Sequence, residues 1–219
     1  MRFTHVGALS LLILAGSATA NAQSSLPMPP RRFGVLLGVN SSTLGGGDAQ
    51  DASRKAGVVA GVLAVLPVSP VFSFEPEILY TMKGASAHDL DDPASTGELR
   101  MSYIQIPVLA RFELAAATVG PKPYLYAGPA LAFKTSCNFE VHDQGFNLSA
   151  DCQQFESADL KFNSTDFSLI GGIGVAFKTG GHTVSIAARY DHSLSKLSDN
   201  LDLKHRVISL VGTFEFGSR

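Results

Sequence analysis

The sequence predicts an all-β fold, an antiparallel up-and-down barrel of about eight strands that crosses a membrane. Three observations support this prediction. Segments typical of strands alternate with turns from residue 32 onward, and no window keeps the 3.6-residue apolar period of a capped helix. The connections between these segments alternate between long and short. Most segments also carry one continuous apolar face, as a strand does when one side is apolar and the other carries both polar and apolar side chains.

The composition limits the class of protein. Charged residues make up 16% of the 219 residues, against about 25% in ordinary soluble domains. Hydrophobic residues reach 45%, yet no apolar run after residue 22 approaches the ~20 residues of a membrane-spanning helix. The net charge of -2 gives no basic surface for a nucleic acid. A soluble β-domain and a membrane barrel are the two classes left open.

The first residues have the features of an export signal. Arg2 supplies a positive end, Val6 to Ala15 form an apolar core, and small residues recur at Ala18, Ala20 and Ala22. We therefore expect a signal peptide over 1–22, a lead-in segment rich in Pro and Ser over 23–31, and a barrel domain over 32–219. Export would place the mature chain in an oxidising compartment.

The lengths of the connections predict the topology. We expect strands near 32–43, 54–66, 71–84, 98–114, 121–135, 163–178, 182–195 and 203–216. The first, third, fifth and seventh are followed by the long polar stretches Leu44–Ser53, Ala85–Gly97, Ser136–Phe162 and Lys196–Asp202. The others are followed by short turns. Outer-membrane barrels have short periplasmic turns and longer external loops, so this alternation indicates such a barrel with both termini on one side.

The alternation within a strand predicts two faces but does not say which one points inward. In Phe72–Lys83 the side chains of Phe74 and Ile78 share one face, and Glu75 and Glu77 lie on the other. A soluble barrel would bury the apolar face, whereas a membrane barrel would turn it to lipid. The segment lengths, which reach the ~9–11 residues of a tilted spanning strand, favour the membrane.

The mixed faces predict a lumen charge network. They carry few charges, and both signs occur, as expected where side chains pair inside a narrow barrel. The members that we expect are Glu75, Glu77, Arg111, Glu113, Arg189, Asp191 and Glu215. They could form an ion or proton pathway. About eight strands leave an interior just filled by side chains, which favours a paired plug over an open pore.

Two features are unusual for a membrane barrel. Trp is absent, so an aromatic girdle would have to use the tyrosines: Tyr80, Tyr103, Tyr124, Tyr126 and Tyr190. Pro76, Pro107 and Pro129 fall inside expected strands, where each removes a donor from the hydrogen-bond ladder. We expect β-bulges at these prolines.

Cys137 and Cys152 lie in the longest expected loop, and two cysteines in an exported chain predict one disulfide. Closing so short a loop should restrain the unfolded chain by about 3 kcal/mol. A metal site that joins these cysteines to His142 or Asp151 is the alternative. A second loop carries His88 followed by Asp89, Asp91 and Asp92, which could hold a divalent cation, although a solvated acidic loop is favoured. The sequence predicts no cofactor and no metal site.

Several segments together resemble the porin-family group of small outer-membrane β-barrel proteins, related in architecture to OmpA- and OmpX-type barrels. They occur in order between residues 33 and 216: Phe33–Asn40, Phe74–Tyr80, Tyr103–Pro107, Pro123–Pro129 and Arg189-Tyr190. The resemblance implies a barrel in the bacterial outer membrane but no single activity. It implies as partners outer-membrane lipid, lipopolysaccharide and the barrel assembly machinery, with a monomer favoured. That machinery reads a terminal aromatic residue, to which Phe214 and Phe216 correspond, although Gly217-Ser218-Arg219 follows.

One segment invites an enzymatic interpretation. Asp191, His192, Ser193 and Ser195 are close together in sequence, and outer-membrane lipid A deacylases use a serine, a histidine and an acid on a similar barrel. Their motif places Ser two positions after His, where this chain has Leu194. The glycines of the segment 171–174 have no strand-to-helix context for a nucleotide loop and suit close packing instead. We predict no catalytic residues.

The predicted function is therefore that of a non-enzymatic outer-membrane barrel with a filled lumen, which displays its external loops. Two alternatives stay open at this point. One is a soluble periplasmic barrel that binds a lipid-like ligand in a greasy interior. The other is a barrel hydrolase that modifies lipid, which would need His192 and a nearby serine.

Overall fold

The computed structural model describes residues 29–47, 53–88, 96–114, 120–143, 146–152, 163–198 and 202–217. The predicted signal peptide over 1–22 lies outside these residues, as do residues 218 and 219. The described strands are β1 (Arg32–Gly45), β2 (Ser53–Pro67), β3 (Phe72–His88), β4 (Thr96–Glu113), β5 (Lys122–Asp143), β6 (Phe146–Asp151), β7 (Thr165–Thr179), β8 (His182–Ser193) and β9 (Lys204–Gly217). In this part of the chain no helix could cross a bilayer.

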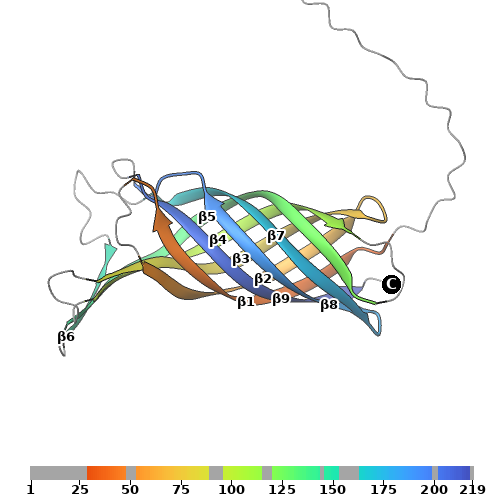
Figure 1. The fold of residues 1–219 in the computed structure, drawn as a ribbon, viewed down its shortest axis with the longest axis horizontal. Helices are drawn as coiled ribbons and strands as arrows, with labels where there is room; N and C mark the ends of the chain where they lie inside the picture. Colours follow the sequence, from red (N-terminus) through yellow and green to blue (C-terminus); the bar gives the residue numbers. More distant parts are fainter. Residues whose placement is uncertain are drawn as a thin grey trace, which may run out of the picture.

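Eight of these strands close into an antiparallel barrel (Figure 1). Each pairs with the next along the chain, and β1 pairs with β9 from Arg32↔Gly217 to Gly45↔Lys204. The ninth strand, β6, pairs with β5 alone and forms a hairpin that extends beyond the barrel. The predicted eight-stranded up-and-down barrel is confirmed. Closure leaves no unpaired edge along the barrel wall, which lipid would not tolerate.

The turns between β2 and β3 and between β7 and β8 lie at one end of the molecule, together with the start of β1 and the end of β9 (Figure 1). We call this the turn end, and the opposite end, which carries the β5–β6 hairpin, the loop end. Between β7 and β8, Thr179 pairs with His182 around Gly180 and Gly181, whose φ values are 55° and 89°. Two successive positive φ values suit the two-residue hairpin turn that matches strand twist, and glycine adopts them without strain.

At the loop end the strands run further than predicted. The ladder between β3 and β4 continues to His88↔Thr96, and β5 pairs with β6 from Asn138↔Asp151 to Asp143↔Phe146. The sequence prediction placed loops over Ala85–Gly97 and Ser136–Phe162, and it was wrong for these parts. A paired strand satisfies its own backbone groups whatever its side chains are, so a polar sequence outside the membrane can still form a ladder.

The apolar faces point outward, as predicted for a membrane barrel. Ile173, Ile78 and Val108 are 68%, 55% and 46% exposed, while their alternating neighbours are buried in the lumen. Large outward side chains occur on every barrel strand, for example Leu37, Val62, Phe74, Phe112, Leu131, Phe177, Ile186 and Phe214. Soluble monomers rarely expose apolar patches beyond a few hundred Å², so a belt of this extent requires lipid around it. The soluble alternative would require these side chains to fill the interior instead.

The aromatic girdle differs from the prediction. Tyr103, Tyr124 and Tyr126 are 1–3% exposed and point into the lumen, so only Tyr80 and Tyr190 among the five face outward. Near the turn end, phenylalanines and a histidine form the outward aromatic contacts instead. The ring centroids lie 4.8 Å apart in Phe72–Phe112, 5.0 Å in Phe214–Phe216 and 5.2 Å in His182–Phe214. Position in the pleat, and not residue type, decides which rings reach the membrane interface.

The three prolines lie inside strands, but the bulges expected there are absent. Around Pro76 the β2–β3 ladder is interrupted between Leu63↔Glu77 and Leu66↔Phe74 and resumes in the same register. The β4–β5 ladder behaves likewise between Pro107↔Ala130 and Ala110↔Ala127. In the described ladders the register shifts lie elsewhere, within Arg54–Val59 of β2 and at Ser102–Tyr103 of β4. Each proline therefore loses a hydrogen bond without changing the register that its neighbours hold.

Candidate functional site

The candidate site is the barrel lumen, where buried charged side chains form two groups. The group nearer the turn end is centred on Arg111 of β4, which is 1% exposed. Its guanidinium donates to Glu75 of β3 at 2.7 Å and to Glu215 of β9 at 3.2 Å. Arg32 of β1 donates to the other oxygen of Glu215 at 2.6 Å. The Glu215 carboxylate on β9 therefore binds side chains from β1, the strand with which β9 closes the barrel, and from β4.

Arg189 of β8 forms the second strong pair of this group. It donates through both terminal nitrogens to the two oxygens of Glu77, at 2.8 and 2.7 Å. A bidentate pair of this kind fixes the relative orientation of the guanidinium and the carboxylate as well as the distance between them. Glu77 lies on β3, so the pair crosses the lumen instead of joining neighbouring strands.

Tyrosine rings support both arginines. The Arg111 guanidinium carbon lies 3.8 Å from the centroid of the Tyr124 ring, and that of Arg189 lies 5.2 Å from the Tyr126 ring. Gly172 and Gly174 face these rings, because a Cβ added to either glycine would come within 2.6 Å of Tyr126 or 2.5 Å of Tyr124. The glycines of β7 therefore make room for the rings that hold the arginines in place.

At the mouth of the turn end the charges are less buried. The Glu113 side chain is 14% exposed and lies 3.7 Å from Arg32 and 3.5 Å from Lys122. Six of the seven predicted network residues are buried in the lumen, and Glu113 is the partly exposed member at its rim. Five of them join the turn-end group with Glu113, whereas Asp191 belongs to the other group.

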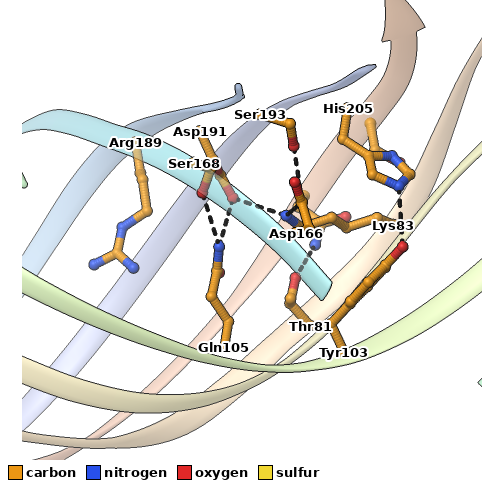
Figure 2. A network of polar contacts seen from close by, with 12 residues as sticks. Thr81, Lys83, Tyr103, Gln105, Asp166, Ser168, Arg189, Asp191, Ser193 and His205 are labelled. Carbon is orange, nitrogen blue, oxygen red and sulfur yellow. Dashed lines mark hydrogen bonds and ion pairs between the residues drawn. The ribbon is translucent and has the colours of Figure 1, made fainter. Parts of the chain in front are cut away.

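The loop-end group surrounds Lys83 of β3 (Figure 2). Its ammonium lies 3.1 Å from Asp166 of β7 and 3.1 Å from Asp191 of β8. Gln105 donates to Asp191 at 2.9 Å, and Ser193 donates to Asp166 at 2.8 Å. The lysine is thus held between two carboxylates that each have a further neutral donor.

Next to this group, the Tyr103 hydroxyl and His205 Nε2 are 3.3 Å apart (Figure 2). These two side chains and Asp166 line a cavity of about 10 Å³, which is at the lower limit for holding a single water. Apolar side chains fill other parts of the interior, among them Leu36, Leu63, Leu79, Leu109 and Val211. In the described residues the lumen is therefore filled by apolar side chains together with charged and polar ones.

The residues of the enzymatic interpretation do not come together. Asp191 and Ser193 are buried in the lumen, but His192 between them points outward, where its ring stacks 6.1 Å from Tyr190. The Ser193 hydroxyl donates to Asp166 and Ser195 also donates to Asp166, at 2.9 Å. A strand wall separates the histidine from the lumen hydroxyl, so these side chains cannot act as nucleophile and base.

Cys137 and Cys152 form a disulfide in the structure, with Cα atoms 5.4 Å apart. Both are buried next to Met101, Tyr103 and Leu197. The alternative metal site is left without thiolate ligands, and in the described residues no three metal-ligating side chains gather. Asp89, Asp91 and Asp92 of the acidic loop lie outside the described residues, as do the side chains of His88 and His142.

Sequence reasoning missed several members of the lumen groups. Arg32, Lys83, Gln105, Asp166 and His205 were absent from the predicted network. The period of two along each strand could have found them, because Asp166 precedes the outward Phe167 and Lys83 continues the face of Glu75 and Glu77. What no local pattern gives is the partner of each charge across the lumen.

Comparison with known proteins gives the same architecture. A family model described as outer membrane protein beta-barrel domain matches residues 21–199. The outer membrane protein OprG from Pseudomonas aeruginosa is 12% identical, with a TM-score of 0.50, and the match covers 87% of this chain and 98% of that one. Neisserial surface protein A is 16% identical over 85% of this chain and 97% of that one, with a TM-score of 0.47.

The attachment invasion locus protein Ail of Yersinia pestis, solved with the heparin analogue sucrose octasulfate, is 13% identical. The match covers 85% of this chain and 99% of Ail, with a TM-score of 0.43. A comparison with curated proteins gave no match. At these identities the likeness to OprG supports the barrel fold alone.

Proposed function

Because this chain belongs to the outer membrane protein beta-barrel domain family and resides in the bacterial outer membrane, we propose that it is a non-enzymatic barrel with a plugged lumen. Its role is to hold external loops on a rigid wall at the cell surface. The packed lumen is the observation that carries this proposal. Six charged residues of the predicted network are no more than 5% exposed, and each has an ion-pair partner inside the lumen.

The rigidity of the wall follows from the energetics of these pairs. Breaking a buried ion pair by removing one partner leaves an uncompensated charge and costs about 3–5 kcal/mol. Arg111, Glu215 and Arg32 form a continuous chain of such contacts, so opening a water-filled path would require several to break together. A plug of this kind favours a structural barrel over a diffusion channel.

The loop end supports a display function. β5 and β6 extend beyond the barrel as a hairpin, and the Cys137–Cys152 disulfide joins β5 to the residue that follows β6. A cross-link at this position restricts the hairpin without occupying its exposed side chains, such as Leu148. Functional residues are often carried on loops that a rigid scaffold positions.

Two measurements test the plugged barrel. After detergent extraction from outer membranes, the unheated chain should migrate differently on a gel from the heated chain. Proteoliposomes that hold the folded chain should not swell in a solution of a small sugar, whereas liposomes with an open porin should. Recovery in the soluble periplasmic fraction would contradict the location, and swelling at the rate of the porin would contradict the plug.

We propose in addition that the chain is a monomer in contact with outer-membrane lipid and lipopolysaccharide, and that the barrel assembly machinery inserts it. The support for insertion is the aromatic end of β9, where Phe214 and Phe216 point outward at the turn end. Sedimentation in detergent should give the mass of one chain. Replacing Phe216 with Ala should reduce the amount inserted in cells more than it reduces refolding of the purified chain.

The lipid-modifying hydrolase is tested separately. His192→Ala should leave the composition of lipid A unchanged, because the imidazole lies outside the lumen and away from Ser193. A changed lipid A composition in this variant would contradict the non-enzymatic assignment.

A further inference from the structure

The segment 194–198, which follows β8, lies over the loop end of the lumen, and we call it the strap. The amides of its first two residues donate to the Phe167 carbonyl at 2.8 and 3.3 Å, and the Leu197 amide donates to the Leu203 carbonyl at 2.8 Å. The Leu197 side chain is 6% exposed and lies in one apolar cluster with Tyr103 and the disulfide. These contacts are local, so the strap can open while the barrel stays folded.

The strap covers His205 of β9. Strap residues 195–197 line the cavity of about 10 Å³ together with Tyr103, Asp166 and His205. His205 is 2% exposed, so its ring lies in the interior behind the strap. The Ser195 hydroxyl donates to Asp166 at 2.9 Å, which ties the strap to the loop-end group. Opening of the strap would therefore expose both the imidazole of His205 and the loop-end group to water.

The contacts of the His205 ring show where it can take up a proton. The Tyr103 hydroxyl donates to Met101 Sδ at 3.2 Å, so its oxygen is left to accept a hydrogen bond from His205 Nε2, 3.3 Å away (Figure 2). This arrangement places the proton of the neutral ring on Nε2. Nδ1 is then the basic nitrogen, and among the described residues it has no hydrogen-bond partner. The next proton therefore binds at Nδ1.

A proton on Nδ1 is poorly accommodated while the strap is closed. In the described part of the chain, the titratable groups around His205 come from the strap and four strands: Lys196, Lys83 of β3, Tyr103 of β4, Asp166 of β7 and Asp191 of β8. Lys83 repels a positive charge on His205, and the two carboxylates that attract this charge already share the ammonium of Lys83. The cavity is large enough for about one water, so a charged imidazole would lack solvation, which is costly.

With the strap open, the imidazole is solvated and this cost disappears. A solvated imidazole binds a proton with a pKa of about 6.5. Because only the open form takes up the proton readily, acid shifts the equilibrium between the two forms toward the open one. Above about pH 7.5 the imidazole is neutral in both forms, so pH then no longer acts on the strap through this residue.

We propose that the strap is an acid-sensitive cover over the loop-end group, and that proton uptake at Nδ1 of His205 opens it. Opening exposes Lys83, Asp166 and Asp191 to water from the loop end. The inference goes beyond the proposed function, since a plugged barrel requires no moving part. The ion pairs of Arg111 lie nearer the turn end, so the plug remains when the strap opens.

The test measures hydrogen exchange of the Leu197 amide by NMR, with the full mature chain in lipid nanodiscs. Protection is corrected for the intrinsic exchange rate at each pH. We expect it to fall about tenfold from about pH 7.5 to about pH 5.5, the shift produced by an imidazole that titrates only in the open form. H205Q should show no such fall, because its amide can donate to Tyr103 but does not titrate. The matched control is H192Q, which removes the outward histidine of β8 and should keep the tenfold fall.

Three outcomes would overturn the proposal. Protection of the Leu197 amide that does not change with pH in the wild type would exclude an acid-sensitive strap. An equal fall in H205Q would exclude His205 as the group that binds the proton. Heat-modifiable migration checks that H205Q folds, and the ¹⁵N signals of His205 in the wild type give a measurement that needs no variant. They should show a neutral ring protonated at Nε2 at about pH 7.5, and a charged ring under these conditions would also overturn the proposal.

Discussion

Individual side chains in the lumen are fixed by partners far away in sequence. Glu77 and Arg189 are 112 positions apart, yet both terminal nitrogens of the guanidinium donate to the two carboxylate oxygens. The Tyr126 hydroxyl accepts a further hydrogen bond from Arg189 at 3.3 Å. Removing one member of such a pair lowers the stability of the fold strongly, because no water replaces the lost partner of the remaining charge.

Removal of one partner tests this cost. We expect Glu77→Ala to lower the free energy of unfolding by about 3–5 kcal/mol, because it leaves the Arg189 guanidinium buried without its acceptor. Urea unfolding in lipid vesicles, followed by heat-modifiable migration, measures the change. The control is the double variant E77L/R189M, which replaces both charges with apolar groups and should lie closer to the wild type than E77A does. Equal losses in the free energy of unfolding for E77A and E77L/R189M would contradict a paired role for Glu77.

At the scale of secondary-structure elements, the strands tolerate local defects because their neighbours hold the register. The β2–β3 and β4–β5 ladders resume unchanged after the interruptions near Pro76 and Pro107. The β5–β6 hairpin lacks this protection, since β6 pairs with β5 alone and has six residues. An isolated hairpin is marginal in water, so we infer that the disulfide supplies much of its stability.

Loss of the disulfide should therefore act locally. In C137S/C152S the hairpin loses the restraint on a 15-residue loop, a contribution of about 3 kcal/mol. Limited proteolysis of intact vesicles should cut the chain between β5 and β7 faster than in the oxidised wild type. The heat-modifiable migration of the barrel should not change, because its eight strands pair without β6. A barrel that no longer forms would show that the disulfide acts on the whole fold.

For the whole molecule, the surrounding lipid decides which face of each strand is outside. Ile173, near the middle of β7, is 68% exposed, and Val184 near the turn end of β8 is 41% exposed. In water such a surface would drive association. In a bilayer it is the interface that holds the barrel in place, and its sensitivity to charge depends on depth.

Charge placed at two depths tests the orientation. Ile173→Arg should lower the free energy of unfolding in vesicles by about 2–4 kcal/mol, whereas Val184→Arg should lower it by about 0–1 kcal/mol, because the cost of a cation falls toward the interface. Chemical unfolding in vesicles of one lipid measures both. Equal effects for the two variants would place both residues at the same depth, and no effect for either would contradict contact with lipid.

The sequence by itself determined the strand content and the direction of most side chains. The period of two is a local property of the backbone, so residues such as Phe74, Val108 and Arg111 could be assigned to a face before any fold was known. The alternation of loop lengths then gave the up-and-down order of the barrel. The same reasoning assigned the tyrosines too freely to the interface, because it used residue type where the position in the pleat decides.

Only the tertiary structure decided which groups meet across the lumen. The partner of Arg189 depends on how the strands are staggered around the closed barrel, and the stagger is a property of all eight ladders together. The extension of β5 into a hairpin and the register shift in β2 depend in the same way on pairing between strands. Pairing is a long-range property, so no pattern within one segment encodes it.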